Sequence, residues 1–431
     1  MTSSALLPPA GQLAVPARVR DLARDLGRAP AALPAYVYDL ADLAAHTARI
    51  RAALPEDVHL HYAVKANPDP EVLHTVARYT SGLEVSSGGE RRHAAAAVPG
   101  SALAFGGPGK TGTELTEAVQ AGTARFHVES PHELLMLAVI SRAAGRVVDV
   151  LLRVNLGAEH PAPPGARTAA GETLAMGGAP TPFGMDEVLL DQCGTLLTGS
   201  GRRIGASPGT SLGTGSGPIR LRGLHAHLAS GLDASALLDT ARRVVGFGRR
   251  WCARHGVTGP EFNLGGGMAV DYTQPGRRFD WDRYGRGLAA LARSGETLRV
   301  EPGRSVTAYC GWYVTRVLDV KHSHGQAFAV VAGGTHHLRT PAAKGHDQPC
   351  AVIPVAEWTP GWPRPGVTGE PVTITGQLCT PKDVLARRVP LPRLRAGDLV
   401  VFGMAGAYAW NISHHDFLMH PPPGFHHLAM G

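Results

Sequence analysis

The chain has 431 residues, with 42 Lys and Arg against 35 Asp and Glu, and a formal net charge of +7. This length suffices for two domains, and because the basic residues are spread out without a nucleic-acid-binding motif, we expect no nucleic-acid partner. No apolar run reaches about 18 residues, so we expect no membrane span. An N-terminus unlike a signal peptide and five cysteines without a CxxC pair favour the cytoplasm.

Residues 1–40 are predicted to form an N-terminal segment with one short helix near 17–26 and a strand at 35–39. From residue 41 a short apolar strand, a polar or glycine-rich loop and an amphipathic helix follow one another repeatedly. Eight such strands alternate with seven helices over roughly 250 residues, which favours a closed (β/α)8 TIM-like barrel over an open Rossmann sheet. We expect this barrel to occupy residues 41–305. The predicted strands are HLHYAVK, GLEVS, ALAFG, RFHVES, VVDVLLRVNL, RGLHAHLAS, EFNLGGG and TLRVEPGR.

Two stretches depart from this pattern. Residues 157–218 interrupt the barrel, and the Gly/Ser-rich part around 195–218 has no periodicity, which predicts a disordered insertion. An ordered piece near 182–184 and a short helix after it are expected inside the interruption. After Arg304 strand-like runs follow with few helices between them, so residues 306–431 are predicted to be a mostly-β domain, which the strand at 35–39 joins.

Polar residues gather at the carboxyl ends of the predicted barrel strands. In a (β/α)8 barrel this face carries the active site, and so many polar groups on one face are hard to explain as surface decoration. They are Lys65, Glu84, Ser86, Glu90, Lys110, Glu129, Arg153, Asn155, His225, His227, Ser230, Gly265, Gly266, Gly267, Glu301 and Arg304.

Lys65 ends an apolar run and precedes Asn-Pro. On its own, such a lysine most often extends to water at a strand end. At the rim of a core, however, its partly desolvated ammonium would be easier to deprotonate, and a neutral amine can form a Schiff base with a carbonyl.

Three glycines at 265–267 follow another apolar strand and can aim backbone N–H groups at a phosphate, although a flexible turn would look the same. Arg304, one strand further on, could bind the same phosphate with its guanidinium fork. Glu301 would keep a pyridine nitrogen protonated and so make the ring an electron sink.

His225 and His227 alternate on one strand, so their rings are expected to point to opposite sides. With no matched carboxylate or cysteine set, this pattern disfavours zinc, and no metal is expected. The inward ring could stack on a flat cofactor or be a hydrogen-bonded core histidine.

Taken together, the motifs resemble the fold-type III pyridoxal-phosphate decarboxylases, which include the diaminopimelate, ornithine and arginine decarboxylases. The resemblance covers about residues 34–417, with the motifs in family order. It implies an alanine-racemase-like barrel, a C-terminal β domain and pyridoxal 5′-phosphate as cofactor. The motifs are YAVKAN, LEVSSGGE, GGPGK, HVES, RVN, GLHAHLAS, NLGGG, EPGR, GQLCTPKD and GMAGAY.

The family's functional residues carry over position by position. By resemblance Lys65 is the Schiff-base lysine, His227 stacks on the pyridine ring and Glu301 is its pyridinium partner. The phosphate contacts are implied to be Ser230, Gly265, Gly266, Gly267, Arg304 and Tyr408.

Two further residues imply the reaction and the assembly. Cys379 in GQLCTPKD matches the cysteine that these decarboxylases extend across a dimer interface to protonate the carbanion, and Asp383 matches an acidic residue near the substrate. A homodimer with shared active sites is therefore expected. A racemase would need bases on both faces, so Cys379 favours loss of CO2.

The positions at which this sequence departs from the family's motifs indicate which substrate it takes. Glu84 stands where many relatives have Asp. After the AFAVV strand, neither the Arg-Pro…Leu-Tyr element of diaminopimelate decarboxylases nor the Asp-Gly…Tyr element of ornithine decarboxylases is present. The GGTHHLRTP element there looks like the siderophore-biosynthesis branch, whose members decarboxylate an amino acid joined to citrate, as in the staphyloferrin B pathway.

In this reading His336, His337 and Arg339 are donors suited to a carboxylate-rich distal group, although the histidine pair could also be a turn without substrate contact. The substrate expected is citryl-2,3-diaminopropionate or a similar conjugate. Alternatives are a diaminopimelate or other basic amino acid decarboxylase, and a non-catalytic pyridoxal-phosphate-binding homologue.

Overall fold

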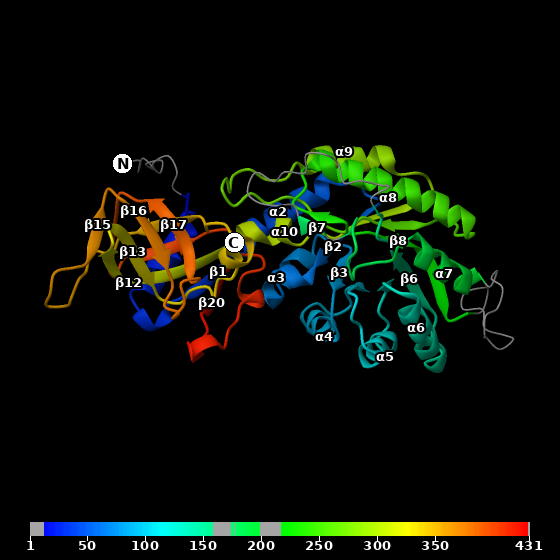
Figure 1. Ribbon diagram of the computed structural model, residues 1–431, viewed down its shortest axis with the longest axis horizontal. Coiled ribbons are helices and arrows are strands. Elements are labelled where there is room, and N and C mark those ends of the chain that lie inside the picture. Colours follow the sequence, from blue (N-terminus) through cyan, green and yellow to red (C-terminus); the bar gives the residue numbers. More distant parts are fainter. Residues whose placement is uncertain (1–12, 158–173, 176, 199–216, 430–431) are drawn as a thin grey trace.

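The computed structural model describes residues 13–157, 174–175, 177–198 and 217–429. They form a (β/α)8 barrel beside a mostly-β domain, so the predicted fold class is confirmed (Figure 1). Among the described residues, no helix combines the length and the apolar character that crossing a membrane requires.

Eight parallel strands close the barrel in the order β10-β11-β2-β3-β4-β5-β6-β8. All eight coincide with strands that the hydrophobic pattern predicts. Large apolar side chains such as Tyr62, Phe105 and Phe262 are buried completely, as expected for parallel strands covered by helices. The strands are β2 (Val58–Ala63), β3 (Gly82–Val85), β4 (Leu103–Phe105), β5 (Arg125–Val128), β6 (Val148–Arg153), β8 (Ile219–His225), β10 (Glu261–Asn263) and β11 (Thr297–Val300).

The barrel helices begin at capping residues shortly after the strands, which keeps the connecting loops short. The side chain of Ser87 accepts from the N–H of Glu90, and Thr111 forms a capping box with Glu114. The helices are α2 (Leu40–Ala53), α3 (Pro70–Ala77), α4 (Gly88–Ala97), α5 (Gly112–Gln120), α6 (Pro131–Ala143), α8 (Ala234–Arg254) and α9 (Trp281–Leu291).

The interruption between β6 and β8 contains one more helix, α7 (Glu187–Thr198), where a short helix is predicted. Of the segment expected to be disordered, residues 195–198 end this helix, and 199–216 lie outside the described residues. A two-stranded piece, β7 (Leu174–Ala175) with β9 (Ala229–Ser230), joins the interruption to the loop after β8.

The second domain is built on an eight-stranded sheet with the path β14-β19-β12-β13-β16-β17. The N-terminal strand β1 joins it, pairing antiparallel with β12 and parallel with β20. Helix α1 (Ala17–Gly27) packs its buried residues against the same sheet. The strands are β1 (Ala35–Asp39), β12 (Gly311–Ser323), β13 (Gln326–Val331), β14 (Cys350–Ile353), β16 (Pro371–Thr375), β17 (Val384–Pro390), β19 (Leu399–Phe402) and β20 (Gly424–Leu428).

Two further short helices and a further pair of short strands belong to the second domain or lead into it. Helix α10 (Arg304–Thr307) leads from β11 of the barrel into β12 of the second domain, and α11 (Thr340–Lys344) follows β13. Strands β15 (Gly366–Thr368) and β18 (Arg393–Arg395) pair with each other. The turn from barrel to sheet therefore lies next to the carboxyl end of β11, where the predicted site residues are.

Candidate active site

A cavity of about 920 Å³ opens at the carboxyl ends of the barrel strands. It brings together groups from β2, β3, β8, the loop after β10 and the end of β11, as the barrel topology predicts. Of the residues singled out from the sequence, it is lined by Lys65, Glu84, Ser86, Arg153, His225, His227, Ser230, Gly266, Gly267, Glu301, Arg304 and Tyr408.

Lys65 lies in a short 3-10 turn (Val64–Ala66) directly after β2, and 44% of its side-chain surface is accessible, facing the cavity. Its ammonium forms an ion pair and a hydrogen bond with the carboxylate of Glu84 on β3. Ser86 is a second partner, with its Oγ 3.4 Å from Lys65 Nζ and 3.1 Å from Glu84 Oε1.

This pairing corrects one step of the sequence argument. Burial alone would lower the pKa of Lys65, as expected, but the charge of Glu84 outweighs it and the pKa is raised above its ordinary value. Without a carbonyl compound in the cavity, Lys65 is therefore a protonated amine held in place by Glu84.

The loop after β10 forms a backbone cradle. A Cβ on Gly266 would lie 2.6 Å from the carbonyl oxygen of Glu301, and one on Gly267 only 2.3 Å from that of Ala229. Gly265 and Gly267 have φ angles of 65° and 101°, which side chains rarely adopt. The loop thus requires glycine and leaves room for a group that approaches the backbone closely.

Arg304 begins α10 at the edge of this cradle. Its Nη1 donates to the hydroxyl of Tyr272 at 2.8 Å, and its guanidinium lies 4.4 Å from the centre of the Tyr408 ring. Two aromatic rings therefore hold the guanidinium toward the cavity.

Glu301 lies at the floor of the cavity, with 6% of its surface exposed. Asn263 Nδ2 donates to its Oε1 at 2.6 Å. Burial, followed by the charge of Glu84, raises the pKa of Glu301 to about 7. The carboxyl group is thus poised to share a proton with a basic ring nitrogen at neutral pH.

Both His225 and His227 line the cavity, so the prediction that their rings point to opposite sides is wrong, because β8 ends at His225 and His227 lies beyond the strand. His227 Nδ1 accepts from the N–H of Gly266 at 3.2 Å, and its Nε2 lies 3.4 Å from Ser230 Oγ. Burial, then the charges of Lys65 and Arg153, lower the pKa of His227 to about 3, so the ring is neutral. It can lie against a flat cofactor without adding positive charge.

His225 is stacked on His127, with ring centres 4.2 Å apart, and each Nε2 lies 3.7 Å from an oxygen of Glu301. The structure thus places a carboxylate beside the histidines, which the sequence argument found lacking. The amide nitrogen of Asn263 contacts both His127 and Glu301, so these groups form a polar floor beneath the cavity.

These features fit pyridoxal phosphate. The glycine cradle with Ser230 and Arg304 suits a phosphate, Glu301 suits a pyridine nitrogen, and Lys65 supplies an amine for an aldehyde. The cavity is wide enough to hold a substrate beside the cofactor.

Apart from Tyr408, the site residues predicted in the second domain do not line this cavity in the same chain. Cys379 is exposed on the loop between β16 and β17. Asp383 is buried in that loop and accepts from the N–H of Thr335 at 2.6 Å and of Leu378 at 2.8 Å. Its carboxylate therefore links the loop that contains Thr335 to the loop that contains Leu378 through hydrogen bonds.

The side chains of the Thr-His-His-Leu-Arg element (residues 335–339) are mostly buried. Both ring nitrogens of His337 are engaged, Nδ1 by the hydroxyl of Tyr313 at 3.0 Å and Nε2 by the carbonyl of Pro421 at 3.0 Å. His336 is completely buried, and Arg339 contacts His414 Nδ1 at 2.9 Å. Their predicted substrate contacts would need a change of position or a second chain.

Several cavity residues were missed by sequence reasoning. Loop 268–280 supplies a wall of the cavity, and Phe183 and His346 line it from elsewhere. The only available signal was that this loop directly follows the three glycines, as substrate loops in barrels do. Its residues in the cavity are Met268, Ala269, Val270, Asp271, Tyr272, Arg277, Arg278, Phe279 and Asp280.

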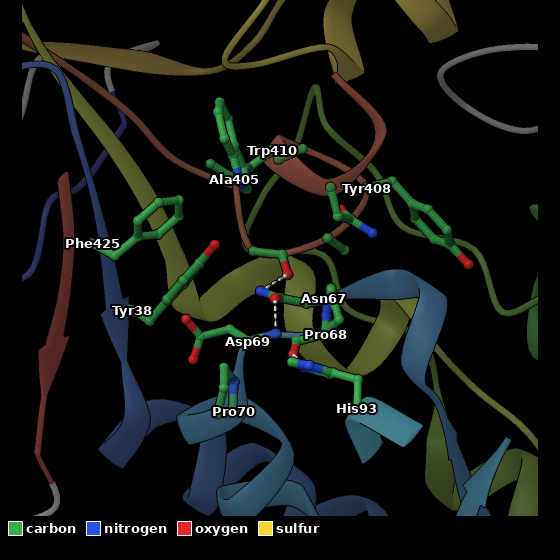
Figure 2. A pocket seen from close by; sticks show the side chains of 14 residues that line it. Tyr38, Asn67, Pro68, Asp69, Pro70, His93, Ala405, Tyr408, Trp410 and Phe425 are labelled. Atoms are coloured by element: carbon green, nitrogen blue, oxygen red, sulfur yellow. Dashed lines mark hydrogen bonds between the residues drawn. The ribbon is translucent and has the colours of Figure 1, made fainter. Parts of the chain in front are cut away.

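A smaller cavity of about 240 Å³ lies between the barrel and the β domain. Figure 2 shows Asn67 at its centre, where Nδ2 donates to the carbonyl of Gly406 and Oδ1 accepts from the N–H of Asp69, both at 3.0 Å. The ring of Tyr408 points away from Tyr38 and Phe425 (Figure 2), and Tyr408 also lines the large cavity. The smaller cavity thus lies behind loop 405–411, whose Tyr408 also lines the large cavity.

The sequence was compared with known proteins. A family model described as pyridoxal-dependent decarboxylase, C-terminal sheet domain, matches residues 35–406. The chain is 37% identical to a 2-[(L-alanin-3-ylcarbamoyl)methyl]-2-hydroxybutanedioate decarboxylase of Staphylococcus aureus, over 91% of this chain and 94% of that one. It is 30% identical to an L-glutamyl-[BtrI acyl-carrier protein] decarboxylase of Niallia circulans, over 90% and 87% of the two chains.

The fold was compared with solved structures. A point mutant of diaminopimelate decarboxylase from Helicobacter pylori, complexed with L-lysine, superposes with a TM-score of 0.75 at 24% identity, covering 92% of this chain and 91% of that one. That likeness concerns the fold, whereas the family model and the decarboxylase relatives give the cofactor and the reaction class. The chain belongs to the family of pyridoxal-dependent decarboxylases.

Proposed function

We propose that this enzyme removes the α-carboxylate of an amino acid whose side chain is joined to citrate, of the citryl-2,3-diaminopropionate type, in siderophore biosynthesis. The observation that carries the proposal is the 37% identity, over nearly the full length of both chains, to the Staphylococcus aureus decarboxylase. The name of that relative describes such a conjugate, an alanine linked through C3 and an amide to a hydroxy-dicarboxylate.

Two features of the chain support the same substrate class. The GGTHHLRTP element replaces the Arg-Pro and Asp-Gly elements expected for free diaminopimelate or ornithine. The 920 Å³ cavity also has room for a conjugate larger than a free amino acid.

Each residue of the site has a separate role in holding the cofactor. Bound pyridoxal phosphate supplies an electron sink for the charge that loss of CO2 leaves on the α-carbon. Lys65 holds the cofactor through its amine, Glu301 keeps the ring nitrogen protonated and His227 holds the ring. The phosphate is held by Ser230, Gly265, Gly266, Gly267, Arg304 and Tyr408.

Cys379 completes the reaction in this proposal by donating a proton to the α-carbon. Because Cys379 is exposed and does not line its own chain's cavity, it would have to come from a second copy of the chain. We therefore propose a homodimer with shared active sites, in which Asp383 and the elements around His336, His337 and Arg339 lie near the neighbouring site. The few, scattered cysteines support a cytoplasmic location.

A diaminopimelate or other basic amino acid decarboxylase is the alternative. It is favoured by relatives such as the diaminopimelate decarboxylase of Bacteroides thetaiotaomicron, 28% identical over 81% of this chain. A non-catalytic homologue is disfavoured, because Lys65, Cys379 and Asp383 are all present.

The proposal is tested by incubating the enzyme and pyridoxal phosphate with a panel of free diamino acids and citryl conjugates. We expect mass spectrometry to detect the citryl-2,3-diaminopropionate product lacking one carboxylate, and Lys65→Ala to form none. Turnover of free diaminopimelate alone would contradict the proposal.

A further inference from the structure

One wall of the large cavity carries two arginines that are adjacent in the sequence and lie outside the glycine cradle. Arg277 and Arg278 lie in the loop between β10 and α9, are exposed and line the cavity. Arg278 lies over the ring of Tyr309, 4.3 Å from its centre, and 3.7 Å from Asp42. Within the described residues, the guanidinium of Arg277 has no hydrogen bond and no carboxylate within 4 Å.

One oxygen of each carboxylate in this loop accepts backbone hydrogen bonds, while Asp271 Oδ2 is buried without a hydrogen-bond partner among the described residues. Asp271 accepts from the N–H of Thr273 at 2.9 Å and of Gln274 at 3.1 Å, which closes its own turn. Asp280 caps α9 by accepting from the N–H of Arg283 at 2.9 Å. Because these carboxylates serve the loop, the two arginines keep most of their hydrogen-bonding capacity for a ligand.

The cationic wall continues toward the cofactor site. Tyr272, from the same loop, accepts from Arg304 and packs against the ring of His346, with ring centres 4.2 Å apart. Arg304 and the glycine cradle already supply the donors that a phosphate needs. Arg277 and Arg278 are therefore surplus to cofactor binding and lie where a substrate group would extend.

We propose that Arg277 and Arg278 are specificity-determining residues that bind the distal carboxylates of the substrate. Guanidinium groups match carboxylates in a bidentate geometry, and two adjacent ones suit a di- or tricarboxylate. His336 and His337 are poorer candidates within one chain, because they are buried. This inference rests on the proposed function and names the residues that select its substrate.

The test uses the enzyme loaded with pyridoxal phosphate and compares Arg277→Ala, Arg278→Ala and Arg277→Lys with Arg286→Ala. Arg286 is an exposed arginine on α9 that does not line the cavity, so it controls for loss of charge. Two quantities are measured, KM and kcat for citryl-2,3-diaminopropionate and the inhibition constant of free citrate, which has no α-amino group to react.

We expect Arg277→Ala and Arg278→Ala each to raise KM and the citrate inhibition constant by roughly 10- to 100-fold, the usual effect of losing a charged hydrogen-bond partner. The value of kcat should change far less, and Arg277→Lys should recover part of the loss. Values that match Arg286→Ala would overturn the inference while leaving the proposed function intact. A wild-type enzyme that does not decarboxylate the conjugate would instead refute the proposed function.

Discussion

The ammonium of Lys65 and the carboxylate of Glu84 form an ion pair at the ends of two neighbouring barrel strands. The charge of Glu84 outweighs burial and raises the pKa of Lys65, so the amine is protonated in the cofactor-free protein. An amine must lose its proton before it can attack a carbonyl, so in the proposed function this pair sets the pH at which the cofactor attaches to Lys65.

Replacing Glu84 by Gln should remove the charge that offsets burial. The pKa of Lys65 should then fall by about 1–3 units, the usual influence of a nearby opposite charge. The pH midpoint of cofactor attachment, followed by the absorbance of lysine-bound pyridoxal, should shift to lower pH. Glu84→Asp keeps the charge and should shift little, and an unchanged midpoint in Glu84→Gln would refute this role.

The glycine cradle predicts a sharp contrast between two substitutions in the same loop. Gly267→Ala places a Cβ 2.3 Å from a carbonyl oxygen at a φ of 101°, so we expect a loss of about 1–3 kcal/mol of stability and weaker pyridoxal phosphate binding. At Gly276 a Cβ would meet nothing within 4 Å, so Gly276→Ala should change stability and cofactor binding very little. Denaturant unfolding and cofactor titration measure both, and equal effects would argue against a built cradle.

Glu301 should leave a signature in the pH dependence of the cofactor-free protein. Its pKa rises from 4.5 to about 7 on folding, so between these values the folded state binds more protons than the unfolded state. Its contribution to the free energy of unfolding is therefore present below pH 4.5 and is lost as the pH rises to about 7, on the order of 3 kcal/mol.

Glu301→Gln removes this titration. The difference in unfolding free energy between wild type and variant should change across this pH window, and buried histidines such as His227 cancel because both proteins contain them. A difference that is independent of pH would contradict a raised pKa. With cofactor, Glu301→Gln should lower kcat by about 100-fold or more, as loss of one preorganised electrostatic group does.

The proposed homodimer with shared active sites predicts complementation between two inactive variants. Lys65→Ala lacks the proposed cofactor amine and Cys379→Ala lacks the proposed proton donor, so each alone should be strongly impaired. Mixed and reassembled in equal amounts, they should regain about one quarter of wild-type activity, since half of the dimers then contain one intact site. No recovery, despite subunit exchange seen by mass spectrometry, would contradict a Cys379 shared across the interface.

Local pattern was enough to predict the barrel and much of the site. All eight barrel strands follow from short apolar runs, and the polar residues at their ends converge because parallel strands share one edge. The sequence alone therefore predicts that one cavity is lined by Lys65, His227, Glu301 and Arg304.

Other features depend on contacts that a sequence does not display. Strands β17 and β20 are polar and weakly patterned, and β20 forms only because β1 offers it a parallel partner. The raised pKa of Lys65 requires Glu84 on the neighbouring strand, which no spacing rule reveals. Likewise, Arg277 stands out only once its loop is seen to form a wall of the cavity.

The most direct measurement of the central claim is kcat/KM for CO2 release from citryl-2,3-diaminopropionate and from free diaminopimelate, with the same enzyme and saturating pyridoxal phosphate. The account predicts a preference of about 1,000-fold for the conjugate, because diaminopimelate offers Arg277 and Arg278 one distal carboxylate beside an ammonium where the conjugate offers two carboxylates. Equal or greater efficiency with diaminopimelate would contradict it.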